Sequence, residues 1–75
     1  MIELAPGITV DPAIRFGRPV IRGTRVPVET IVGRVAAGMS FSEIAEEYEI
    51  TEEDISNALR YAAQRLAEEQ VWVMA

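Results

Sequence analysis

The spacing of hydrophobic residues changes along the chain. In the first third, apolar residues come in two short β-prone runs, Ile8–Val10 and Pro19–Arg22, which are stopped by the turn-forming pairs Asp11-Pro12 and Gly23-Thr24. These runs predict a short two-stranded β element, with Ile21 turned toward the helices and its neighbours on the other face. Because so small a ribbon is marginal in water, we expect it to lie on helices or to pair with another chain.

After the ribbon, the apolar residues recur at helical spacing. A first helix is predicted at residues 28–37, with a proline before its first turn and Gly38 where a left-handed residue ends a helix. A second helix begins after Ser40, because Ser40 and Glu43 have the spacing of a capping box, and it ends near Glu49.

A third helix begins after Thr51, which forms a second capping box with Asp54, and it continues to about Glu69. The apolar positions of this helix are Ile55, Ala58, Leu59, Ala62 and Leu66. Between the second and third helices, Ala45 stands where two helices cross closely and Ile50 fills the corner of a three-residue turn, which is the sequence pattern of a helix-turn-helix.

The predicted fold class is therefore mainly α, a three-helix helix-turn-helix domain preceded by a short two-stranded β element. Residues 1–70 form this single domain, and residues 71–75 form an apolar C-terminal tail. The helix-turn-helix pattern also occurs at helical corners that never contact DNA, so the corner by itself leaves a purely structural role open.

Composition excludes several kinds of chemistry. The 75 residues contain no cysteine and no histidine, which removes thiolate metal sites and the commonest general base. No nucleophile and base can be paired from the remaining residues, so we expect no enzyme activity, no cofactor and no metal site. The chain shows neither a signal-peptide pattern nor an apolar run long enough to cross a membrane, and we expect it to be cytoplasmic.

Charge is divided unevenly along the chain. All seven basic residues are arginines, against twelve acidic residues, and from residue 43 onward nine acids face two arginines. Four arginines lie in an acid-free stretch near the ribbon: Arg15, Arg18, Arg22 and Arg25. This pattern indicates one surface for an anionic partner and one surface for a different partner. Alternatively, Arg22 and Arg25 pair with acids of the same fold, such as Glu29 or Glu43.

The third helix is poorly suited to simple reading of the DNA major groove. It begins with three acids, Glu52, Glu53 and Asp54, which stabilise the helix dipole but repel phosphates. If DNA is bound, the arginine segment must supply most phosphate contacts. The candidate DNA-binding residues are Arg15, Arg18, Arg22, Arg25, Ser56, Asn57 and Arg60, the last three being the ones able to reach base edges. Phe16 is a weaker candidate for stacking on a base or a partner.

Several motifs together resemble the bacterial domain-of-unknown-function family numbered 433. They are Asp11-Pro12, the string Gly17 to Val28, Ala37-Gly38 and Thr51 to Ile55, and the resemblance covers residues 8–66. Family members resemble antitoxins encoded beside a toxin with a PIN-like nuclease fold. The resemblance implies a type II antitoxin that binds and silences such a toxin and also binds its own operator DNA. This chain departs from the family in having Glu49-Ile50 where members carry a proline.

An alternative function is a protein-only interaction module that uses the helix-turn-helix for dimerisation and binds no DNA. A homodimer, through the ribbon or the long helix, is expected in either case. The apolar segment Val71, Trp72, Val73 and Met74 lies beyond the helical pattern. It either folds back on the core or binds the toxin, and we assign these four residues as candidate partner-binding residues.

Overall fold

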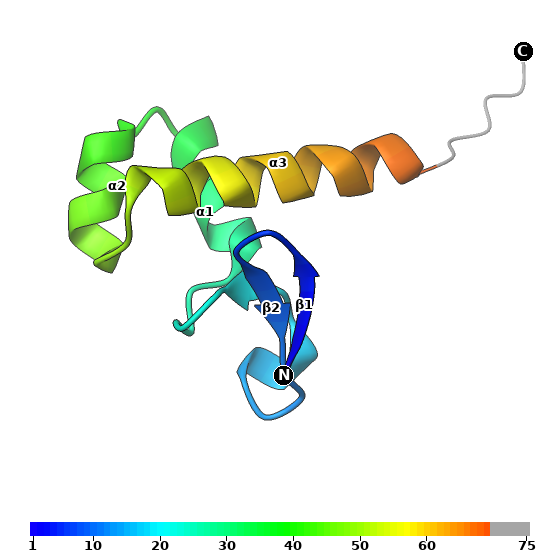
Figure 1. Ribbon diagram of the computed structural model, residues 1–75. Helices are drawn as coiled ribbons and strands as arrows, with labels where there is room; N and C mark the ends of the chain where they lie inside the picture. Colours follow the sequence, from blue (N-terminus) through cyan, green and yellow to red (C-terminus); the bar gives the residue numbers. More distant parts are fainter. Residues whose placement is uncertain (70–75) are drawn as a thin grey trace, which may run out of the picture.

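The domain consists of a small antiparallel sheet and three helices, and a computed structural model describes its residues 1–69 (Figure 1). In chain order the elements are β1 (Ile2–Ala5), β2 (Ile8–Val10), a 3₁₀ turn (Arg15–Gly17), β3 (Val20–Ile21), α1 (Val28–Ala36), α2 (Phe41–Tyr48) and α3 (Glu52–Glu68). The predicted mainly α fold class, with three helices after a β element, is confirmed.

The sheet has three strands in the order β1-β2-β3. The two predicted runs pair as β2 and β3, with Ile8 opposite Ile21. Strand β1 is an addition to the prediction, and it pairs with β2 by placing Ile2 opposite Val10. The Ile2-Glu3-Leu4 stretch alternates apolar and polar residues as a strand does, but its large apolar residues Ile2 and Leu4 are exposed and contribute nothing to the core.

The helix ends form as the sequence predicts. Ser40 Oγ accepts a hydrogen bond from the Glu43 backbone N–H at 3.1 Å, and the Glu43 carboxylate accepts one from the Ser40 N–H at 3.0 Å. Thr51 and Asp54 make the same reciprocal pair, with both distances at 3.0 Å. Gly38 takes a φ of +92° and ends α1. Each of these ends depends on residues three positions apart or less, which is why the sequence pattern predicts them.

One core joins the sheet to all three helices. Its buried residues are Ile8, Ile21, Val28, Ile31, Ile44, Ile50, Ile55 and Ala58. Ile21 packs into it as predicted, but Val20 is also buried although Arg22 is exposed, because Val20 lies between its β2 partner Thr9 and a bridge to Pro27.

Helix α3 is longer than the core that supports it. Its C-terminal end projects past α1 and α2 (Figure 1). Leu66, which continues the apolar stripe in the sequence, is therefore 63% exposed. The stripe predicted burial correctly for Ile55 and Ala58, where α1 and α2 cover the helix, and wrongly for Leu66.

The Ser40–Glu43 capping box predicts a pH dependence of stability. Its hydrogen bonds, first from the Ser40 backbone N–H and then with the Ser40 side chain, lower the pKa of Glu43 below its ordinary value. A carboxylate with a lowered folded-state pKa contributes stability above its unfolded pKa and loses it as pH falls through the folded pKa. We expect Glu43→Gln to lower the free energy of unfolding at neutral pH, and the difference from the wild type to vanish in acid.

Urea unfolding from neutral pH to pH 3 measures this difference. Glu46→Gln is the control, because Glu46 is an exposed acid of the same helix with no capping partner among the hydrogen bonds of residues 1–69. A gap between wild type and Glu43→Gln that stays constant with pH would contradict the capping account.

Candidate interaction surfaces

The corner between α2 and α3 has the geometry of a helix-turn-helix. Glu49 ends α2 in the left-handed conformation with a φ of +55°, and the Ile50 N–H then donates to the Ala45 carbonyl at 3.0 Å. The Ile50 side chain is buried in the corner, and Ala45 packs against the core at the crossing, as predicted. Glu49 thus takes a conformation that glycine favours, and the helix ends here with Glu49-Ile50 where family members carry a proline.

The outer face of α3 near its N-terminus is partly covered by the turn between β1 and β2. A Cβ atom placed on Gly7 of that turn would lie 2.6 Å from Asn57 Nδ2. Asn57 also accepts a hydrogen bond through its Oδ1 from Arg60 Nη1 at 2.9 Å. Ser56 and Asn57 are half-buried and Arg60 is exposed. Two of the three candidate base-reading side chains are thus in contact with each other, and one of them lies against the hairpin.

The four arginines of the ribbon segment are all exposed, but the structure does not bring them to one place. Arg15 and Arg18 border a depression beside the start of α1. Arg22 borders a different depression, together with the Glu53 and Asp54 acids of α3. The predicted arginine surface is therefore divided, and the part nearest the helix-turn-helix lies beside acidic groups that oppose phosphate binding.

Two of these arginines have acidic partners. Arg18 pairs with Glu29 and Arg22 pairs with Glu3, and all four side chains are largely exposed. Exposed pairs of this kind contribute about 0–1 kcal/mol, so a ligand can displace them at little cost. The predicted alternative of pairing within the fold thus applies to Arg22, with Glu3 in place of Glu29 or Glu43. Arg15 and Arg25 make no ion pair within residues 1–69.

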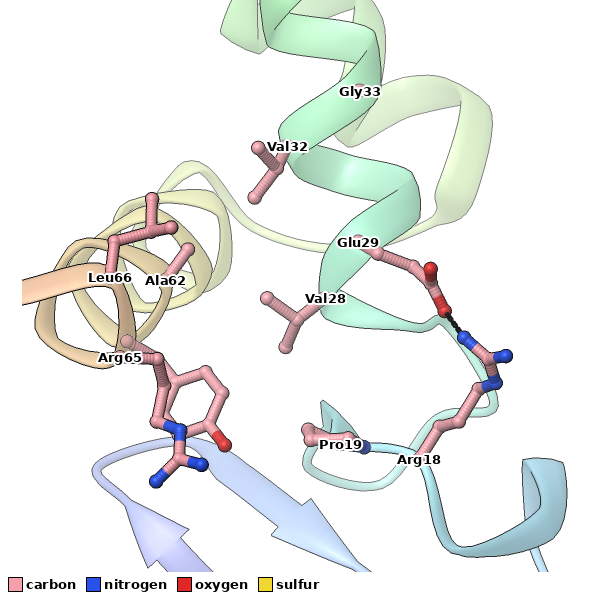
Figure 2. Close-up of a pocket in the computed structure, with 10 residues that line it drawn as sticks. Arg18, Pro19, Val28, Glu29, Val32, Gly33, Ala62, Arg65 and Leu66 are labelled. Carbon is pink, nitrogen blue, oxygen red and sulfur yellow. Dashed lines mark hydrogen bonds and ion pairs between the residues drawn. The ribbon is translucent and has the colours of Figure 1, made fainter. Parts of the chain in front are cut away.

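An apolar groove of about 540 Å³ lies between α1 and α3. Val28 and Val32 of α1 face Ala62 and Leu66 of α3 across it, and the Arg18–Glu29 pair closes one side (Figure 2). The complete lining is Arg18, Pro19, Val28, Glu29, Val32, Gly33, Tyr61, Ala62, Arg65 and Leu66. The sequence pattern does not reveal this groove, because its apolar residues belong to helical stripes that the pattern assigns to the core.

A second feature that the sequence did not reveal joins α1 to α2. Arg34 Nε donates a hydrogen bond to the Tyr48 hydroxyl at 2.8 Å, and this bond raises the pKa of Arg34. The two residues are fourteen positions apart, and no local pattern links them. Tyr48 otherwise packs against the core, so the bond orients its exposed end.

One predicted site falls outside the residues that the structure describes. The apolar segment Val71, Trp72, Val73 and Met74 lies outside the described residues and stays a prediction. Within residues 1–69, acidic side chains form no group of three or more able to hold a metal ion. None of the helices in this part of the chain has the length and apolar character needed to cross a bilayer.

The fold and its surfaces define a helix-turn-helix domain with an antiparallel sheet at its N-terminal end. The chain belongs to the DUF433 family, described as a protein of unknown function, whose family model matches residues 8–62. The membership predicted from the motifs is confirmed.

Among curated proteins, the chain is similar to "Putative antitoxin VapB45" of Mycobacterium tuberculosis, with 33% identity over 52 residues. This alignment covers 69% of the chain and 22% of the relative. The chain is 49% identical over 39 residues to the uncharacterized protein y4eO of Sinorhizobium fredii, an alignment that covers 52% of the chain and 18% of that protein. The chain thus spans about a fifth of the length of the curated relatives it matches.

Two crystal structures resemble the fold. A DUF433 member from Anabaena variabilis matches with a TM-score of 0.74 and 33% identity, covering 83% of this chain and 62% of that one. Rv2018 from Mycobacterium tuberculosis matches with a TM-score of 0.65 and 33% identity, covering 69% of this chain and 24% of that one. The helix-turn-helix with its sheet is thus an arrangement that crystal structures of related chains also contain.

The contact between the hairpin and α3 generates a paired prediction. Gly7 and Gly23 both have a φ of +77°, so alanine at either position carries the same left-handed strain, about 1 kcal/mol or more. Only Gly7 has a close neighbour, because nothing lies within 4 Å of a Cβ on Gly23. We expect Gly7→Ala to lower the free energy of unfolding by about 1 kcal/mol more than Gly23→Ala, since Asn57 must move and give up its bond to Arg60.

Urea denaturation of both variants checks this difference. In an Asn57→Ala background, which lacks both the crowded side chain and its bond to Arg60, Gly7→Ala should cost no more than Gly23→Ala. Equal destabilisation by the two alanine variants would show that the hairpin does not press on α3.

Proposed function

We propose that this chain acts as an antitoxin of a bacterial type II toxin–antitoxin module, binding and silencing a nuclease toxin of PIN-like fold. The observation that carries the proposal is its membership of DUF433 together with its 33% identity to a mycobacterial relative named as an antitoxin. The PIN-like character of the toxin comes from the family resemblance. Because the relative is much longer, the transfer concerns the shared domain only.

The groove between α1 and α3 supports this proposal because it has the make-up of a protein interface. Its centre is apolar, with Val28, Val32 and Leu66, and its edge carries Arg18 and Arg65. Interface centres in proteins are depleted in charge and enriched in apolar side chains, and arginine is favoured over lysine at interfaces. The exposed part of Leu66 is apolar surface that a bound partner would remove from water.

A charged substitution in the groove tests the proposed function. The probe is the protein encoded by the reading frame beside this chain's own, with binding measured by calorimetry and silencing by relief of its nuclease activity. We expect Leu66→Asp to weaken binding at least about tenfold, because it buries a carboxylate in an apolar contact. Leu66 is 63% exposed in the free chain, so the fold should be unaffected.

Ala67→Asp is the matched control, since Ala67 is exposed on the next position of α3 and does not line the groove. If the wild-type chain fails to bind the neighbouring protein, the antitoxin proposal is wrong. If both aspartate variants weaken binding equally, the toxin does not use the groove.

Operator binding by a symmetric homodimer is the second candidate function, favoured by the helix-turn-helix corner. A dimer would double the number of arginines, and β1, the outer strand of the sheet, pairs with only one strand in the part of the chain described. The acids at the start of α3 oppose phosphates, so the contacts must come from the exposed arginines. The alternative to operator binding is a protein-only module, in which the helix-turn-helix corner serves dimerisation and binds no DNA.

Salt titration of binding to the chain's own promoter separates these alternatives. We expect Arg22→Ala and Arg25→Ala each to weaken binding and to reduce the slope of log K against log salt by about one for every phosphate that a protomer no longer neutralises. Light scattering of the free protein at micromolar concentration should give the mass of a dimer. Loss of binding from Ser56 and Asn57 substitutions alone would indicate readout by α3. No promoter binding at low salt would leave the protein-only antitoxin.

A further inference from the structure

The turn that precedes β3 holds an unusual backbone. Arg15, Phe16 and Gly17 have consecutive positive φ angles of +51°, +57° and +79°. Only glycine adopts this region freely, because a Cβ atom approaches the following carbonyl oxygen. The strained turn is held by hydrogen bonds from the Gly17 N–H to the Ile14 carbonyl and from the Arg18 N–H to the Arg15 carbonyl, both at 3.1 Å.

This backbone presents the Phe16 side chain to solvent. Phe16 is 100% exposed, more than any other large hydrophobic residue in residues 1–69. It therefore contributes nothing to the core, and a glycine at the same position would satisfy the turn with less strain. Residues held in strained conformations cluster at sites where the strain serves a contact. The combination of a strained turn with a large exposed aromatic points to an interaction rather than to folding.

The surroundings of Phe16 connect it to the groove. Phe16 borders a depression whose lining includes Arg15, Arg18 and Glu29. Arg18 and Glu29 also line the groove between α1 and α3, so the turn and the groove are parts of one continuous surface. With Glu29 paired to Arg18, Arg15 is the arginine beside Phe16 that has no ion pair within the described residues.

We propose that Phe16 is the anchor of the toxin-binding surface, inserting into an apolar pocket of the toxin while Arg15 meets a carboxylate at the rim of that pocket. This inference rests on the proposed antitoxin function and names its central contact. A buried aromatic is the type of residue that dominates binding energy at interfaces. Because the turn holds Phe16 in place before binding, the entropic cost of ordering it on association is reduced.

Charge favours a protein over DNA as the partner at this surface. DNA binding requires several phosphates to be neutralised, and each contact needs a cation. Here the Arg18–Glu29 pair carries no net charge, which leaves Arg15 as one cation beside an aromatic ring. One cation is enough for a single carboxylate and too little for a row of phosphates.

Three substitutions at Phe16 separate the contribution of its side chain to binding from the effect of the backbone strain on stability. The probe is again the protein encoded beside this chain's gene, titrated against the full chain by calorimetry, with thermal melting of each free variant measured in parallel. We expect Phe16→Ala to weaken binding at least about tenfold with little change in melting temperature, since the side chain is fully exposed. Phe16→Gly should weaken binding as much while its melting temperature rises, because the strain is relieved. Phe16→Leu should keep part of the affinity.

Gln64→Ala is the control, an exposed α3 substitution away from both depressions and the groove, and it should bind like the wild type. If the wild type binds the toxin and Phe16→Ala binds equally well, the anchor is wrong while the antitoxin function stands. If the wild type does not bind, both proposals fail. If Phe16→Ala abolishes promoter binding or changes the oligomeric mass and keeps full toxin affinity, Phe16 faces DNA or a second copy, and the proposal is overturned.

Discussion

The structure depends on one cluster in which five elements each contribute a fully buried isoleucine. Ile8 of β2, Ile21 of β3, Ile31 of α1, Ile44 of α2 and Ile55 of α3 are all at most 1% exposed. Residues 1–69 contain no second core to take over, and truncating one such side chain to alanine typically costs about 2–5 kcal/mol. The sheet is too short to be stable in water by itself, and the helices hold it through this contact.

Two large apolar side chains, Leu66 and Phe16, lie outside this isoleucine cluster and are exposed. Helix α3 continues beyond the cover of α1 and α2, which leaves Leu66 on an open groove, and the turn before β3 exposes Phe16 completely. Neither side chain is needed to close the core. An apolar groove and an exposed aromatic on one continuous surface are features of a chain that completes its burial on a partner.

Electrostatics distinguishes the surfaces of the domain from one another. The three acids at the start of α3 stabilise the helix dipole, and Thr51 and Asp54 cap its end, but the same charges oppose phosphate at the position where a recognition helix meets DNA. Three of the four ribbon arginines are divided between the depression beside Phe16, with Arg15 and Arg18, and the one beside the α3 acids, with Arg22. This arrangement supports the proposed toxin as the principal partner and leaves any DNA contacts to the exposed arginines, two of which would first give up weak surface pairs.

The sequence alone determined the features that depend on near neighbours. Both capping boxes, the glycine that ends α1, the helix-turn-helix corner at Ile50 and the family motifs are each made by residues a few positions apart, so local hydrogen bonding and spacing were sufficient. The tertiary structure decided the rest. The partner of Arg22 is nineteen residues away, and the contact of Gly7 with Asn57 joins opposite halves of the chain. The exposure of Leu66 depends on how far α1 and α2 cover α3. Such contacts arise only when distant segments pack together. A residue pattern along one segment does not show which other segment covers it, so only the tertiary structure reveals the candidate surfaces.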